Sequence, residues 1–140
     1  MRGRSIRIVE FYLKNYAPFY ESMGIREFHF ERRTSPNKII LILAGNGIGK
    51  TYLLAELSPE PLEHIAGRTS NRYIAGEEGE KRIHYIVDDT FEYVCHIIYS
   101  PDRKKTTCFI TQINLITGMK AELNPNGNVT SYMDIVGVHL

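Results

Sequence analysis

The residues best suited to chemistry form a short glycine-rich stretch, residues 44–51. It reads Ala-Gly-Asn-Gly-Ile-Gly-Lys-Thr and differs from the G-x-x-x-x-G-K-[ST] phosphate-binding motif only at its first position. The glycines let successive backbone N–H groups turn toward an anion without steric conflict. Lys50 supplies a positive charge for the β- and γ-phosphates, and the Thr51 hydroxyl can bind Mg²⁺. The predicted nucleotide-binding residues are Ala44, Gly45, Asn46, Gly47, Ile48, Gly49, Lys50 and Thr51.

The flanking residues are those that such a loop needs. Residues 38–43 are a lysine followed by five Ile and Leu residues, a run typical of a strand buried on both faces in a parallel sheet. Residues 52–57 are rich in helix formers and do not alternate, which argues against a hairpin turn between two strands. A helix beginning here would add its free N–H groups and its dipole to the anion site. The sequence therefore predicts a strand, a phosphate loop and a helix.

Two basic groups are candidates for phosphate or DNA contact. Arg68 and Arg72 lie in a loop-like stretch and could reach a nucleotide phosphate or a DNA backbone. Arg103, Lys104 and Lys105 form the tip of a predicted hairpin and could contact a DNA backbone. A solvated loop and a hairpin tip charged for solubility explain the same residues, and both interpretations stay open.

Hydrolysis needs a carboxylate that holds Mg²⁺ and a group that positions the attacking water. Asp88 and Asp89, after the strand-like run 83–87, are the candidate that the sequence offers. However, Asp88-Asp89-Thr90 also stands where two alternating strands need a tight turn, and we favour the turn. The sequence therefore predicts nucleotide binding without a complete catalytic set. His29 falls on the polar side of an alternating strand, where a solvated histidine is the expected interpretation.

The remaining chain is rich in strand patterns and forms one predicted domain, residues 1–140. The expected elements are a first strand at 5–13, a half-buried strand at 25–31 paired with it, an antiparallel meander of strands at 81–87, 91–99 and 106–113, a turn at 124–127, and a last helix with Thr130 or Ser131 as N-cap and Ile135, Val138 and Leu140 on one side. Residues 16–19 are expected only to break the first strand.

Composition describes an ordinary domain and indicates no charged partner. The 140 residues carry 17 Lys and Arg against 16 Asp and Glu, a net charge of +1, so any DNA contact must come from local patches. The sequence has no apolar run of membrane-spanning length and its amino terminus lacks a signal-peptide core, which predicts a cytoplasmic protein without membrane contact. Cys95 and Cys108 lack metal-ligand spacing and are expected to be reduced and buried.

The order of elements over residues 5–57 resembles the start of SbcC-like ATPases of the SMC and ABC superclass. The resemblance is carried by the strand ending at residues 13–19, the aromatic strand 28–30 and the loop, where Asn46-Gly47 matches the family's G-x-N-G-x-G-K-[ST]. Ala44 and Ile48 depart from that pattern. Residues 81–113 are similar in character to the family's antiparallel sheet, and residues 124–131 look most like phage-encoded members.

The resemblance implies an α/β fold: a P-loop NTPase head of the ABC/SMC type, here its amino-terminal lobe, with mixed and antiparallel β-sheet and few helices. It also implies ATP and Mg²⁺ as ligands, dimerisation of ATPase heads, and action on DNA in recombination or repair with an SbcD-type nuclease. ATP hydrolysis would belong to a longer protein, of which this chain would be a truncated, inactive part. The glutamine loop would lie beyond Leu140, and Gln112 is not assigned to it.

Three other functions stay open from the sequence. A defence ATPase of the overcoming-lysogenization type would share the motif. A stand-alone kinase or GTPase would use Asp88 or Asp89 for Mg²⁺. A non-enzymatic, nucleotide-responsive DNA-binding module would use the cluster 103–105.

Overall fold

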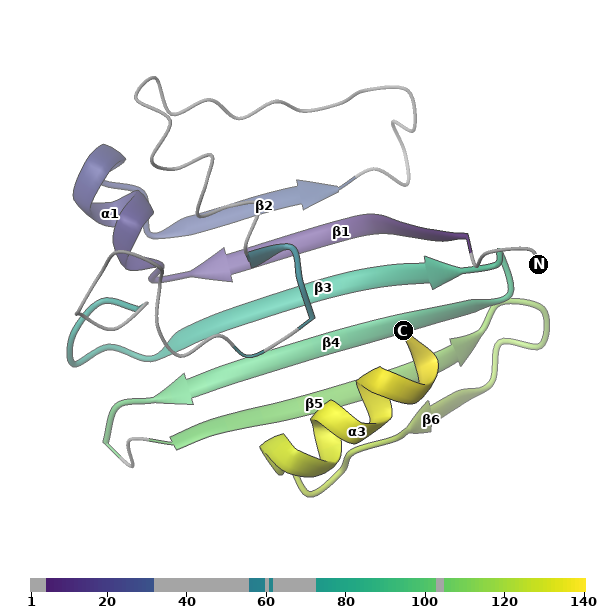
Figure 1. Cartoon of the computed structure of the whole chain (residues 1–140). Helices are drawn as coiled ribbons and strands as arrows, with labels where there is room; N and C mark the ends of the chain where they lie inside the picture. Colours follow the sequence, from purple (N-terminus) through teal and green to yellow (C-terminus); the bar gives the residue numbers. More distant parts are fainter. Residues whose placement is uncertain (1–4, 32–55, 60, 62–72, 103–104) are drawn as a thin grey trace.

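The computed structural model describes residues 5–31, 56–59, 61, 73–102 and 105–140. These residues form a six-stranded sheet with the order β2-β1-β3-β4-β5-β6 (Figure 1). The strands are β1 (Ile6–Lys14), β2 (Glu27–Glu31), β3 (Gly79–Val87), β4 (Phe91–Ser100), β5 (Lys105–Asn114) and β6 (Lys120–Glu122), and the helices are α1 (Ala17–Met23) and α3 (Val129–His139).

This architecture overturns the predicted fold class. Every strand pairing of the sheet is antiparallel, whereas the expected P-loop NTPase fold alternates parallel strands with helices. The physical reason is connectivity: β3, β4, β5 and β6 follow one another through short turns, which can join only antiparallel neighbours. The described chain is thus a mostly antiparallel sheet with two short helices. The strand expected at 38–43 lies outside the described residues, as does the helix expected at 52–57 except for Glu56 and Leu57.

The strands that the sequence predicted at 5–13, 25–31, 81–87, 91–99 and 106–113 are confirmed. β1 pairs with β2 antiparallel, Leu13 opposite Phe28, and β3, β4 and β5 form the expected meander. Each of these strands has one face that packs on the core, largely buried in β1, β3 and β4 and partly buried in β2.

Four local features differ from the prediction. Residues 16–19 do not simply break β1, because α1 begins there, with a proline in its first turn and Gly24 as a left-handed cap (φ 71°). The N-cap of α3 is Asn128, whose side chain accepts a hydrogen bond from the Ser131 backbone N–H. The buried residues of α3 are Tyr132 and Val136; of the predicted apolar side, Ile135 and Leu140 pack partly buried against the core, whereas Val138 is 69% exposed. The exposed strand β6 was not predicted.

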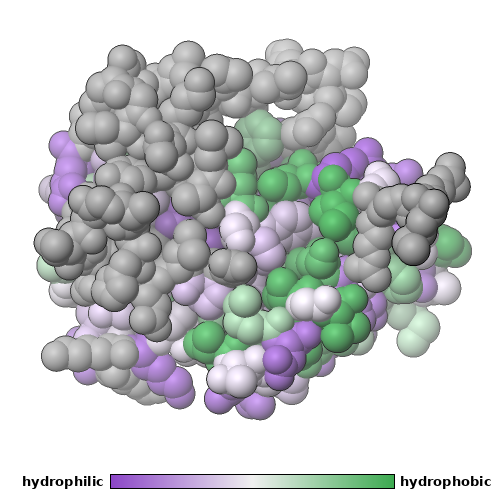
Figure 2. Space-filling view, in the orientation of Figure 1, coloured by the Kyte–Doolittle hydropathy of each residue, from purple (hydrophilic) through white to green (hydrophobic). Residues whose placement is uncertain are grey.

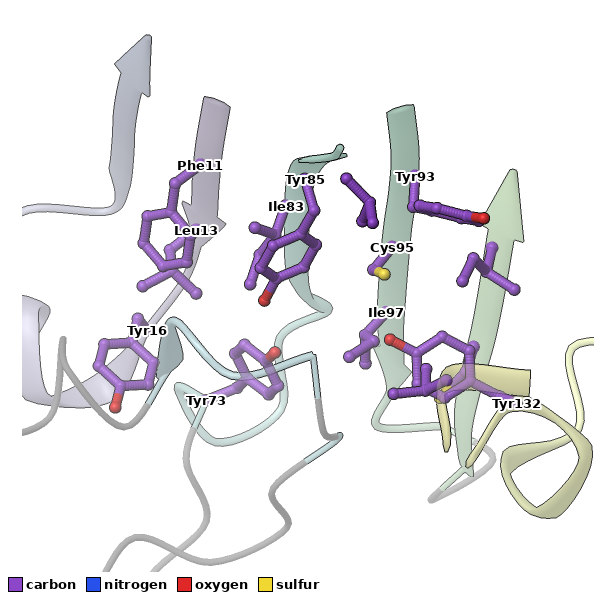
Figure 3. Close-up of a cluster of buried hydrophobic side chains, with 14 of the residues drawn as sticks. Phe11, Leu13, Tyr16, Tyr73, Ile83, Tyr85, Tyr93, Cys95, Ile97 and Tyr132 are labelled. Atoms are coloured by element: carbon purple, nitrogen blue, oxygen red, sulfur yellow. The ribbon is translucent and has the colours of Figure 1, made fainter. Parts of the chain in front are cut away.

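The core lies on one face of the sheet, the face on which α3 packs against β5 (Figure 1). Apolar side chains gather in the middle of this face (Figure 2). The fully buried members include Phe11 and Leu13 from β1, Ile83 from β3 and Ile97 from β4, and Tyr132 joins them from α3 (Figure 3). Both cysteines are free and buried in this core, as predicted.

Candidate functional site

Most of the predicted site residues lie outside the described residues: Ala44, Gly45, Asn46, Gly47, Ile48, Gly49, Lys50, Thr51, Arg68, Arg72, Arg103 and Lys104. Lys105 is described, and it is an exposed residue at the start of β5. The described segment that follows the glycine-rich motif most closely is residues 56–59. Its contacts give the structural information nearest to the predicted site.

Residues 56–59 are held against the core face by buried donors. Glu56 has helical backbone, and the chain turns immediately after it. The Tyr85 hydroxyl donates to the Leu57 carbonyl oxygen at 2.6 Å, and the Lys81 Nζ donates to that of Ser58 at 2.9 Å. From the helix α3, the Tyr132 hydroxyl donates to the Pro59 carbonyl oxygen at 2.6 Å. Three consecutive carbonyls therefore accept hydrogen bonds from Lys81, Tyr85 and Tyr132, which we call the carbonyl clamp.

Lys81 also forms a buried ion pair. Its Nζ lies 3.0 Å from the Glu56 Oε1, and the two side chains are 0% and 1% exposed. Lys81 occupies a core-facing position of β3, opposite Leu13 of β1 and Ile97 of β4. A charged pair without solvent is costly to desolvate, so its retention requires close geometry and further hydrogen bonds, both of which are present here.

The surroundings of the clamp shift the pKa values of neighbouring groups. Burial raises the pKa of the Cys95 thiol to about 11, while a hydrogen bond with Tyr132 and the charge of Lys81 act in the opposite direction. Burial is also the main cause of the raised pKa values of Tyr85 and Tyr132. In Figure 3, Tyr132 reaches from α3 toward Cys95 and Ile97 of β4. The hydroxyls of Tyr85 and Tyr132 therefore stay neutral at physiological pH and can donate hydrogen bonds.

Asp88 and Asp89 occupy a tight turn between β3 and β4, as the favoured interpretation predicted. Both have positive φ, 51° and 53°, and they are the central residues of a turn that the Thr90 backbone N–H closes by donating to the Val87 carbonyl oxygen at 3.1 Å. The Asp88 Oδ1 accepts a hydrogen bond from the Ser5 backbone N–H at 2.9 Å, and Asp89 lies 3.0 Å from Arg7. The two carboxylates are therefore engaged in fastening the start of β1 to this turn.

The other face of the sheet carries histidines and glutamates. The His84 Nδ1 lies 2.7 Å from the Glu92 Oε2, and the His29 Nε2 lies 3.1 Å from the Glu10 Oε2. His29 is 55% exposed, which agrees with the solvated position expected from alternation. Within the described ranges, no group of three His, Cys, Asp or Glu residues is arranged to hold a metal ion.

An open hollow of about 570 Å³ lies beside the β4–β5 turn. Its described charged lining residues are Glu78 and Asp102, which would repel a phosphate group. The described residues that line the hollow include no positively charged side chain. On the histidine face Arg82 is described, but its guanidinium lies 3.6 Å from the Glu80 carboxylate and over the Tyr12 ring.

The sequence prediction missed the carbonyl clamp and Glu56. One signal could have found Lys81: in β3 the alternation of Lys81, Ile83, Tyr85 and Val87 places a lysine among core residues. Its partners, the Glu56 carboxylate and the Ser58 carbonyl, lie 25 and 23 residues away in the sequence, so no pattern near Lys81 predicts them.

No helix in the described part of the chain is long and apolar enough to cross a membrane. Searches for related proteins gave no match, whether to a protein family, to a curated protein or to a solved structure.

Proposed function

We propose that this chain binds ATP with Mg²⁺ through residues 44–51. The observation that carries the proposal is the sequence Ala-Gly-Asn-Gly-Ile-Gly-Lys-Thr itself, in which spaced glycines precede a lysine and a hydroxyl residue. Phosphate binding by such a loop depends on local backbone N–H groups and on the lysine, so the proposal does not require a parallel sheet. The hydrogen bonds to the carbonyls of residues 57–59 support the proposal, because they fix the segment that follows the motif to the core.

The proposed role is that of the amino-terminal part of an SbcC-like ATPase that acts on DNA in recombination or repair with a nuclease partner in the cytoplasm. Its support is the Asn46-Gly47 pair and the order of elements before the motif. The engagement of Asp88 and Asp89 in a hairpin turn argues against a stand-alone kinase or GTPase that would use them for Mg²⁺. We therefore expect the chain to bind ATP and to turn it over negligibly.

The test is the affinity of the whole chain for a fluorescent ATP analogue in the presence of Mg²⁺. Lys50→Ala should abolish binding, because the charge that faces the β- and γ-phosphates is lost. Lys120→Ala is the matched control, since it removes an exposed lysine of β6 outside the motif and outside both basic groups, and it should leave the affinity unchanged. Undiminished affinity in a folded Lys50→Ala variant, or no binding by the unaltered chain, would refute the proposal.

A further inference from the structure

The carbonyl clamp joins the segment after the phosphate motif to two separate parts of the core. Lys81 and Tyr85 belong to β3, in the middle of the sheet, and Tyr132 belongs to α3. All three side chains are at least 95% buried. An apolar side chain at any of these positions would avoid the free-energy cost of burying a polar group. Filling the core therefore does not by itself explain why these three side chains are polar.

The hydrogen bonds of the carbonyl clamp determine where the main chain of residues 57–59 lies on the core. They end on carbonyl oxygens of the main chain at residues 57–59, so they fix the backbone whatever side chains it carries. Glu56, which is helical, is held in addition by its ion pair with Lys81. The last carbonyls of a helix lack partners within the helix, and donors placed there determine where the helix ends. The clamp thus fixes the chain six to eight residues after Thr51.

We propose that Lys81, Tyr85 and Tyr132 are positioning residues for ATP binding: by holding residues 57–59 they set the ATP affinity of residues 44–51 and couple it to the sheet and to α3. This inference rests on the proposed function. The coupling must be reciprocal: if the hydrogen bonds of the clamp strengthen ATP binding, ATP binding must in turn strengthen these hydrogen bonds. None of the three side chains needs to touch the nucleotide.

Tyrosine-to-phenylalanine variants test the inference with little change in volume. Tyr85→Phe and Tyr132→Phe each remove one bond to residues 57–59. Tyr93→Phe is the matched control: Tyr93 is a buried tyrosine of the same core, but its hydroxyl contacts His139 and Gln112 instead. We expect the Tyr85→Phe/Tyr132→Phe double variant to bind the fluorescent ATP analogue about 5- to 20-fold more weakly, a typical range for coupling between sites. Tyr93→Phe should stay within about twofold of the unaltered chain, since it leaves the clamp intact.

Hydrogen exchange of the unaltered chain tests, without any substitution, whether ATP binding strengthens the clamp. Saturating ATP should slow amide exchange in α3, residues 129–139, because Tyr132 would be held more firmly. If the unaltered chain binds ATP but the double variant matches Tyr93→Phe in affinity, or α3 exchanges at the same rate with and without ATP, the inference is overturned and the proposed function stands. If the unaltered chain does not bind ATP, both are refuted.

Discussion

Replacing Lys81 by methionine should destabilise the fold far more than any surface substitution. The change removes the ammonium that lies 3.0 Å from the Glu56 carboxylate and takes away a donor of the Ser58 carbonyl. Both charged side chains are excluded from solvent, so water cannot replace the lost partner. Breaking a buried pair from one side typically costs about 3–5 kcal/mol. Because small domains are stable by only about 5–15 kcal/mol, this is a large share of the free energy of unfolding.

A second variant separates the effect of the lost ion pair on stability from the effect of the changed side-chain shape. The Glu56→Met/Lys81→Met double variant removes both charges of this pair together, and the two thioether side chains fill similar space. Replacing both partners of a buried pair by apolar residues is often neutral, so the double variant should recover most of the loss. We expect it to remain about 1 kcal/mol below the unaltered chain, because the Ser58 carbonyl still lacks the bond from Lys81.

Urea unfolding followed by circular dichroism measures all the free energies in this double-mutant cycle. Lys105→Met is the control, because it removes a lysine from an exposed position and should change stability by no more than about 0.5 kcal/mol. A loss below about 1 kcal/mol for Lys81→Met would refute the buried ion pair. A double variant as unstable as the sum of its two single variants would refute the argument that the lost pairing is the cause.

Three further predictions concern the core and its turns. Stability should fall between pH 9 and pH 11, because burial raises the pKa of Cys95 from 9.0 to about 11 in the folded chain. The stabilisation is complete below pH 9 and disappears above pH 11, and at about 1.4 kcal/mol per pKa unit the loss is about 3 kcal/mol; an unchanged urea midpoint at pH 11 would contradict this. Gly79→Ala should cost about 1–3 kcal/mol in urea unfolding, because its Cβ would lie 2.1 Å from Cγ of the Tyr73 ring, which stacks on Tyr99; a neutral effect would show that the ring is free to move. Asn124→Ala should cost about 3 kcal/mol, because the buried amide donates to the Cys108 and Asn128 carbonyls and accepts from Ser131, and a Tm equal to that of the unaltered chain would exclude these bonds.

Local patterns predicted the strands and the pairing of strands that follow one another along the chain, but they did not predict the pairing of β1 with β3. Runs of β-branched and aromatic residues located β1 and the meander, alternation located β2, and the turn residues located Asp88 and Asp89, because each signal depends on neighbouring residues only. Whether a sheet is parallel or antiparallel depends on which strands become neighbours. The pairing of β1 with β3 joins segments separated by residues 15–78, and no pattern within either strand specifies it.

The features missed around the candidate site have similar physical causes. β6 is three residues long and exposed throughout, so it has no buried face from which to produce alternation. The clamp depends on contacts between residues 57–59 and side chains at positions 81, 85 and 132, which meet only in the folded chain. Sequence reasoning could flag Lys81 as a lysine at a core position, but it could not supply the acceptors.

The adjacency of β1 and β3 has a consequence for the order of folding. The meander of β3, β4 and β5 is built from contacts between consecutive segments and can form early, whereas β1 can join it only by closing a loop that contains residues 15–78. The closure entropy of such a loop rises slowly with length, about 0.6 kcal/mol per doubling. The glycine-rich motif and residues 56–59 both lie inside this loop. Contacts that fasten the loop to the meander, as the Lys81 and Tyr85 bonds do, shorten the free chain that β1 must close and should therefore accelerate the last step of folding.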